Sequence, residues 1–148
     1  MLSSQDAVHT DFVADVSGTY ELSLLVNDGI VDSDASIVTI VAVSLQSALI
    51  SSLNQSIDAI NSLMGEDFKN NNMPKTLTKK ITEVIGEVDE GNYQQAFAKL
   101  SNDVIAKTDG CAVDGDVDKN DWILSCSAQA NVYIYLLQAK TALSQLLN

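Results

Sequence analysis

Few side chains of this 148-residue chain suit covalent or metal chemistry: two cysteines, one histidine and one aspartate-rich stretch. Cys111 and Cys126 flank the aspartate-rich stretch, and they form either a disulfide or two free buried thiols. Their spacing does not match the Cys-x-x-Cys motif of redox-active pairs. His9 has no Cys or His close to it in sequence, which is typical of a surface histidine rather than a ligand or general base.

Oxygen ligands alternate along the aspartate-rich stretch, as a calcium-binding loop requires. The ligands would be Asp114, Asp116, Asp118, Asn120 and Asp121. The EF-hand pattern needs Gly and Glu where this chain has Lys119 and Ser125, so any calcium site here is of another kind. We prefer the simpler interpretation of a solvated turn, in which Asp118 caps the last helix and Asp121 favours its positive end.

The motifs of the common hydrolases and nucleotide-binding enzymes are absent: there is no Gly-x-Ser-x-Gly, Walker loop or His-Glu-x-x-His. A carboxylate pair for glycoside hydrolysis stays open, because any acidic chain offers one. Only 5% of the residues are aromatic, and the single Trp122 is expected to cover the core at a helix start. We therefore expect no enzymatic activity, no catalytic residue and no cofactor, with calcium as the open alternative.

The charge of the chain excludes other classes of protein. The formal net charge is −12, from 20 acidic and 8 basic residues, and every basic residue is Lys. Nucleic-acid-binding proteins need a basic face and usually Arg, so no nucleic-acid partner is expected. The longest apolar run, residues 37–45, is too short to span a bilayer. Residues 1–68 hold ten acidic and no basic side chains, which predicts two units with different surfaces.

The first 43 residues have the pattern of β-strands. Apolar residues alternate over residues 20–26, and Asn27-Asp28-Gly29 follows as a tight-turn signal. Residues 35–43 are rich in Ile and Val, which suit a pleated surface. A weaker third candidate covers residues 10–14. We therefore predict an N-terminal unit, residues 1–43, of about three strands.

From residue 44 the apolar period changes to three and four, which predicts a helical unit over residues 44–148. Four helices are expected: residues 45–65, 74–91, 92–110, and a last one from residues 118–121 to 147. Gly91 and Gly110 are placed to end the second and third helices. Short connections between four helices predict an up-and-down four-helix bundle.

Residues 12–29 resemble the end of a PKD (polycystic kidney disease) domain, which is an immunoglobulin-like β-sandwich. The element Asp15-x-x-Gly18-x-Tyr20 resembles a tyrosine corner, in which the Tyr hydroxyl bonds back to nearby backbone. A complete sandwich takes about 100 residues, so the resemblance implies only the C-terminal part of the domain. Three strands alone would leave apolar surface exposed, and three solutions are available. The strands pack on the helices, the chain is cut from a longer protein, or strands of another chain complete the sheet.

The helical unit is similar to an all-helical module found at the end of large secreted bacterial proteins. The similar segments are residues 68–72, 90–96, 107–111 and 118–123. The resemblance implies location and architecture but no activity. An extracellular setting favours a disulfide between Cys111 and Cys126. The sequence does not open with the pattern of a signal peptide, so two interpretations stay open. The chain is cytosolic, or it is a fragment or mature product of an exported protein. The similar segments favour the second interpretation.

Taken together, the sequence predicts an α+β chain: an incomplete immunoglobulin-like antiparallel β-segment followed by a four-helix bundle. The expected function is that of a non-enzymatic extracellular or cell-surface interaction module. The alternative is a self-assembling subunit of a filament or layer, in which a neighbouring copy completes the open β-segment. The expected partners are proteins, including copies of the same chain, and no transmembrane segment is expected.

Overall fold

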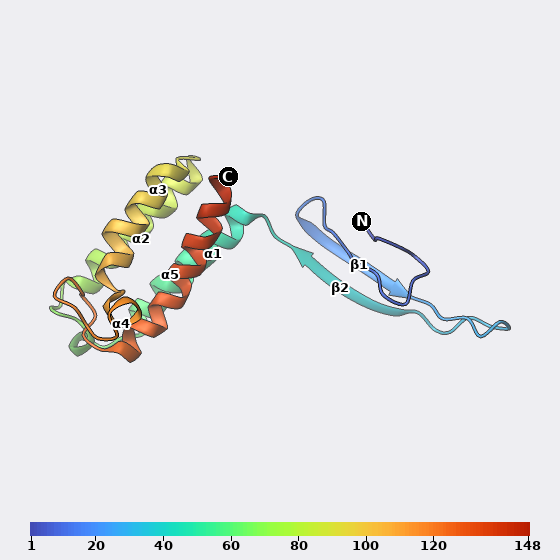
Figure 1. Ribbon diagram of the computed structural model, residues 1–148, viewed down its shortest axis with the longest axis horizontal. Coiled ribbons are helices and arrows are strands. Elements are labelled where there is room, and N and C mark those ends of the chain that lie inside the picture. Colours follow the sequence, from blue (N-terminus) through green and yellow to red (C-terminus); the bar gives the residue numbers. More distant parts are fainter. The chain divides into compact units, whose positions relative to one another are not determined.

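The computed structural model describes residues 1–148, and it separates into two compact units, residues 1–44 and residues 45–148. The first unit contains the only sheet, and the second contains the helices (Figure 1). The prediction of an α+β fold is confirmed. The two units are described separately below.

The sheet of the first unit has two antiparallel strands, β1 (Gly18–Leu24) and β2 (Ser36–Ala42). Gly18 is paired with Ala42, Tyr20 with Ile40, and Leu22 with Val38. Because successive side chains point to opposite faces, these pairs and Leu24 share one face of the sheet. We call this the apolar face: Tyr20, Leu22, Leu24, Val38, Ile40 and Ala42.

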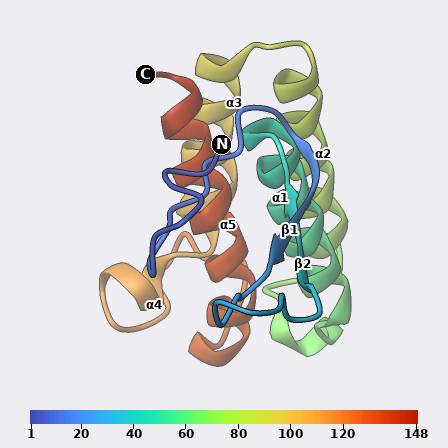
Figure 2. The ribbon, with the colours of Figure 1, turned by 90° about the vertical axis from the view of Figure 1, so that its right-hand side faces the viewer.

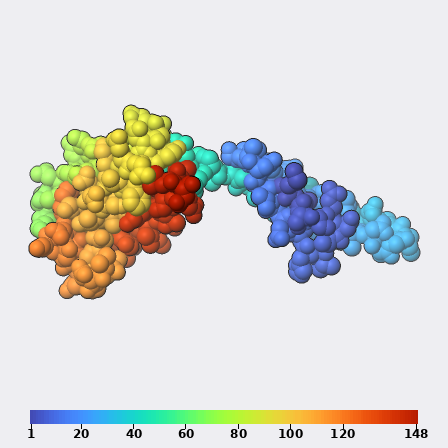
Figure 3. All heavy atoms as spheres, turned by 45° about the horizontal axis from the view of Figure 1, so that its top comes forward, coloured from blue at the N-terminus to red at the C-terminus, as the bar shows by residue number.

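The connection between the strands, residues 25–35, is longer than a tight turn and projects from the sheet as a narrow arm (Figure 3, light blue). Asn27 and Asp32 form an isolated antiparallel bridge across it. At its tip the Asp28 carboxylate accepts hydrogen bonds from the Ile30 and Val31 amides, both 2.9 Å long. Gly29 has φ +94°, which a residue without Cβ adopts freely. The predicted turn is therefore present, but at the end of an arm.

The prediction of a third strand over residues 10–14 is wrong. This segment forms only a single bridge, between Leu2 and Phe12. The Phe12 ring instead lies edge-on to Tyr20, with 4.9 Å between the ring centroids. A side-chain contact with the apolar face has taken the place of a backbone ladder.

The second unit is built from five helices and three short turns of other helical types. The α-helices are α1 (Leu45–Ser62), α2 (Met73–Asp89), α3 (Tyr93–Lys99), α4 (Gly110–Val113) and α5 (Cys126–Leu146). The short turns are η1 (Gly65–Asp67), η2 (Leu100–Val104) and η3 (Ile105–Lys107). Gly91, with φ +77°, follows the end of α2 as predicted.

Helices α1, α2, α3 and α5 run beside one another and share one hydrophobic core (Figure 2). Fully buried residues recur every three or four positions along α1 and α2, which is the spacing that the sequence showed. The largest fully buried apolar side chains are Leu49, Leu53, Ile60, Leu77, Ile81, Leu100, Ile123, Leu136 and Leu143. None of the helices combines the length and apolar character needed to cross a membrane.

Two predicted helix boundaries are wrong. The third helix does not continue to Gly110: it passes through η2 and η3 and ends at Lys107, and Gly110 begins α4. The last helix begins at Cys126, not at residues 118–121, and its N-cap is Ser125, whose hydroxyl accepts a hydrogen bond from the Ala128 amide. Asp118 and Asp121 therefore cap no part of α5.

The delayed start of α5 has a tertiary cause. Ile123 is completely buried and forms an antiparallel bridge with Phe68, flanked by hydrogen bonds from Lys69 to Trp122 and from Leu124 to Asp67. An extended backbone at these positions is incompatible with a helix. Trp122 accordingly lies in this extended segment rather than at a helix start, although it does pack against the core as expected.

Candidate functional site

The two features that bear on function are the β-hairpin of residues 1–44 and the disulfide-linked loop between α4 and α5. In the hairpin, the Tyr20 hydroxyl lies 2.7 Å from the Val16 carbonyl and 2.9 Å from Asp15 Oδ1, and accepts a hydrogen bond from the Val16 amide. Gly18 begins β1 between them. This is the back-bonding geometry of a tyrosine corner, and it anchors the start of β1. The hydrogen bond from Tyr20 lowers the pKa of Asp15.

No side chain of residues 1–44 is buried. On the apolar face, Leu24 is 63% and Val38 is 54% exposed, and only Tyr20, Leu22, Ile40 and Ala42 are half-buried. Apolar surface of this extent normally lies against a second layer, because two strands alone are marginally stable in water. Within residues 1–44, the hairpin therefore has the pattern of one half of a sandwich without its second half.

Both outer edges of the sheet are open, since each strand has one neighbour. β2 carries no charged residue, no Pro and no Gly, and five of its seven residues are β-branched. Natural edge strands are usually protected against pairing by Lys, Pro, a bulge or a covering loop. β2 has neither Lys nor Pro, so its sequence is suited to pairing with a further strand.

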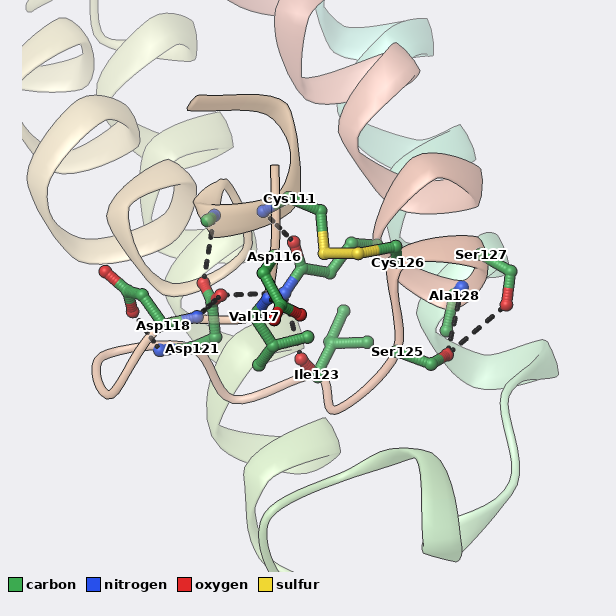
Figure 4. Close-up of a disulfide and its surroundings, with 12 residues drawn as sticks. Cys111, Asp116, Val117, Asp118, Asp121, Ile123, Ser125, Cys126, Ser127 and Ala128 are labelled. Atoms are coloured by element: carbon green, nitrogen blue, oxygen red, sulfur yellow. Dashed lines mark hydrogen bonds between the residues drawn. A yellow bond between two sulfur atoms is a disulfide. The ribbon is translucent and has the colours of Figure 1, made fainter. Parts of the chain in front are cut away.

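In the second unit, Cys111 of α4 and Cys126 of α5 form a disulfide with 5.4 Å between their Cα atoms (Figure 4). The predicted disulfide is therefore present, and neither sulfur is a free thiol. It closes the aspartate-rich loop onto the first residue of α5. The Cys111 amide also donates a hydrogen bond to Gln129 Oε1, 3.0 Å long. α4 and α5 are therefore joined both by the disulfide and by this hydrogen bond.

The centre of the loop is a buried carboxylate without a cation beside it. Asp121 is 1% exposed, and its oxygens accept hydrogen bonds from the Gly110 amide (3.3 Å), the Asp118 amide (2.8 Å) and Gln129 Nε2 (2.8 Å) (Figure 4). Gln129 is equally buried and also donates to the Ile123 carbonyl. Several N–H donors can replace the hydration of a buried carboxylate. We call these residues the Asp121 network: Gly110, Asp118, Asp121 and Gln129.

The candidate calcium ligands have structural roles or lie apart. Asp118 Oδ1 accepts hydrogen bonds from the Asn120 and Asp121 amides, and Asp116 Oδ1 accepts one from the Val117 amide. Asp114 is the C-cap residue of α4. No group of three or more His, Cys, Asp or Glu side chains gathers as a metal site would require. The carboxylates that the sequence suggested as ligands are used mainly to fold the loop.

Asp109, the N-cap residue of α4, is a carboxyl group next to this loop, and its pKa is raised. Burial is the largest cause, and the charges of Asp121 and Asp118 add to it, while Lys140 acts in the opposite direction. The folded loop therefore disfavours the charged form of Asp109 relative to the unfolded chain.

An open apolar depression of about 380 Å³ lies beside the disulfide, between α4 and α5. Its walls include the two cysteines, Tyr133, Ile134 and Leu137, and Ile134 is more than half exposed. No sequence pattern marks this depression, because its lining residues come from both sides of the loop. Gly110 and Gln129 were likewise not predicted as partners of Asp121, since a Gln within a helix usually faces solvent.

Comparison with known proteins gives no match: no family model, no curated protein and no solved structure is similar to the chain. The resemblance to a PKD domain therefore rests on the residues quoted above and stays a hypothesis. The class of protein that the fold defines is an α+β chain with an uncovered β-hairpin and a disulfide-linked helical unit.

We predict that Gly110→Ala destabilises the helical unit by about 1–3 kcal/mol, the usual cost of overpacking. A Cβ at Gly110 would clash with Asp121 Oδ2 and lie 2.8 Å from the Asp118 amide nitrogen. The matched control is Gly86→Ala in α2, where a Cβ meets nothing within 4 Å and a gain of about 0.5–1 kcal/mol is expected. Urea unfolding measures both. Equal effects of the two substitutions would show that the network does not require close approach at Gly110.

We predict that the double variant Cys111→Ser, Cys126→Ser loses about 3 kcal/mol, the chain-entropy value for a loop of this length. Chemical denaturation with and without a reductant measures the loss. The natural chain should fall to the stability of the variant when reduced, and the variant should not respond. A natural chain whose unfolding midpoint is insensitive to the reductant would contradict the prediction.

We predict that Asp109→Asn raises the melting temperature at pH 7 and that the gain disappears towards pH 3. A raised pKa in the folded state means that ionised Asp109 opposes folding at neutral pH, while below the unfolded pKa the carboxyl is neutral in both states. Asp114→Asn is the control, because Asp114 is exposed and lies in the same loop. A gain that is unchanged at pH 3 would rule out an electrostatic cause.

Proposed function

We propose that this chain is a non-enzymatic extracellular interaction module, whose two-stranded sheet is completed by β-strands from outside residues 1–148. The observation that carries the proposal is the apolar face, which has no buried residue although a tyrosine-corner contact anchors β1. A hairpin of this kind gains most of its stability when a further layer or strand covers it. Addition of strands to an open sheet is an established mode of polypeptide recognition.

The extracellular setting is supported by the Cys111–Cys126 disulfide, because disulfides persist mainly in oxidising compartments. The helical unit then serves as the stable part of the module. It has its own core, its own disulfide and a buried polar network, so it does not need the hairpin for its stability. The proposal thus separates a self-sufficient unit from a unit that requires a partner.

Hydrogen exchange on the monomeric full chain tests this proposal. We predict that amides of β1 and β2 exchange orders of magnitude faster than those of α1 and α5, because exchange of an uncovered hairpin needs only local opening. The core amides of α5 are the internal control for folded protein. Protection of β1 and β2 equal to that of α5 in a verified monomer would overturn the proposal, since no completing strand would then be needed.

A second candidate is a self-assembling subunit, in which a neighbouring copy supplies the completing strands. The uncharged β2 edge favours it, because nothing in the strand itself opposes pairing with another β2. The acidic side chains around the hairpin oppose it, so association should strengthen with added salt. Sedimentation across a range of salt and protein concentrations decides: a monomer throughout would remove this candidate.

A further inference from the structure

The carboxylates of the hairpin lie around β2 rather than within it. Residues 1–44 contain seven acidic side chains and no Lys or Arg. Asp32 and Asp34 come just before the first residue of β2, and the 25–35 arm adds Asp28. At the other end, Asp15 lies beside the start of β1, which is the end where Gly18 pairs with Ala42. An uncharged strand is therefore flanked by negative charge at both ends.

Two of these carboxylates, Asp28 and Asp15, have a lowered pKa. Hydrogen bonds from the Val31 and Ile30 amides lower the pKa of Asp28, and the hydrogen bond from Tyr20 lowers that of Asp15. No Lys or Arg of the same unit pairs with them, because the first Lys of the chain is Lys69. The two ends of any segment that pairs with β2 would therefore lie close to these negative charges.

We propose that the open edge of β2 binds an extended polypeptide segment whose centre alternates apolar and small polar residues and whose ends carry Lys or Arg. This inference rests on the proposed function and names the chemistry of the partner. On one face of β2 the partner would lie beside Val38 and Ile40, which suits apolar residues. On the other face it would lie beside Thr39, which suits a small polar residue. The cationic ends match the carboxylates at each end of the strand.

A second copy of this chain fits that description poorly. Pairing β2 with another β2 would bring the two sets of carboxylates together without a Lys or Arg from either hairpin. The chain has one basic stretch with apolar residues at intervals, residues 75–81, but it lies within α2 and its Leu77 and Ile81 are completely buried. The charge of the hairpin thus favours a different, basic partner segment.

Three short synthetic peptides test the inference against the full 148-residue chain. The first has two Lys at each end of an alternating Thr-Val centre; the second has Glu in place of Lys; the third keeps Lys but has Pro in place of one central Val. Fluorescence anisotropy measures binding, and hydrogen exchange locates it. We expect the Lys peptide to bind about tenfold more tightly than the Glu peptide, the sum expected for four exposed charge pairs. The Lys peptide should also slow exchange in β2.

A charge variant assigns the effect to the hairpin. In the triple variant Asp28→Asn, Asp32→Asn, Asp34→Asn, we expect the preference for Lys over Glu ends to fall several-fold. Asn keeps the oxygen that accepts the hydrogen bonds of Asp28 and Asp32, so the arm should keep its shape. Added salt should reduce the same preference in the natural chain.

The matched control makes the same change of net charge in the helical unit. The control variant is Asp58→Asn, Glu66→Gln, Asp89→Asn, three exposed positions outside the hairpin. It should bind the Lys peptide as the natural chain does. If both triple variants lose the preference equally, the net charge of the chain is responsible and the assignment to β2 is overturned.

The outcomes separate this inference from the proposed function. Equal binding of the Lys and Glu peptides overturns the role of charge, and equal binding of the Pro peptide overturns strand pairing. If β2 exchanges rapidly in the monomer and no peptide slows it, the basic-segment inference fails while the interaction-module proposal stands. If β2 is already protected in the monomer, the proposal itself fails.

Discussion

The buried carboxylate of Asp121 governs the geometry of the loop that joins α4 to α5. A buried charge is costly unless donors surround it, and here two backbone amides and the Gln129 side chain supply them. The chain must therefore bring Gly110 close to Asp121 and hold Gln129 on the inner side of α5. The disulfide fastens the same two helices, so covalent and polar constraints act on one junction. The result is a loop shaped by its own carboxylates.

The hairpin differs from the helical unit in having no buried core: none of its side chains is buried, whereas the helices share a hydrophobic core. Its backbone is well specified by register, the tyrosine-corner contact and the asparagine and aspartate turns of the arm. Within residues 1–44, its apolar side chains are nevertheless at most half-buried. Local interactions can thus determine the shape of a small sheet without providing its stability. This difference between the units is the physical basis for assigning recognition to the hairpin.

The sequence predicted the elements whose signal is periodic and local. The three- and four-residue spacing located α1 and α2 to within three residues of their ends. The period-two alternation located β1, and the run of Ile and Val located β2. Cys111 and Cys126 were identified as a disulfide pair without reference to the structure. The helices and strands could be located because their patterns depend on residues close in sequence. The disulfide could be assigned because the chain has only two cysteines.

The features that depend on contacts between distant residues were not predicted. Asp118 and Asp121 have the residue type of helix N-caps, but their bonds go to loop amides, and burial of Ile123 against Phe68 delays α5. Gly110 was interpreted as a helix stop because Gly commonly ends helices. Its role is to allow the approach of Asp121, eleven residues later. The pattern of a single sequence does not show that Gly110 and Asp121 lie close together in the folded chain.

The distribution of charge links the two units at the level of sequence, although each folds by its own interactions. All eight Lys belong to the helical unit, where Lys99 pairs with Glu87 at 2.7 Å and lowers the pKa of that carboxyl. The hairpin has no Lys or Arg that could pair with its carboxylates in the same way. Stability cannot explain this absence, because exposed ion pairs contribute little. Under the proposed function, the negative charge around this open, uncharged strand instead selects which segments can approach it, as at a binding surface.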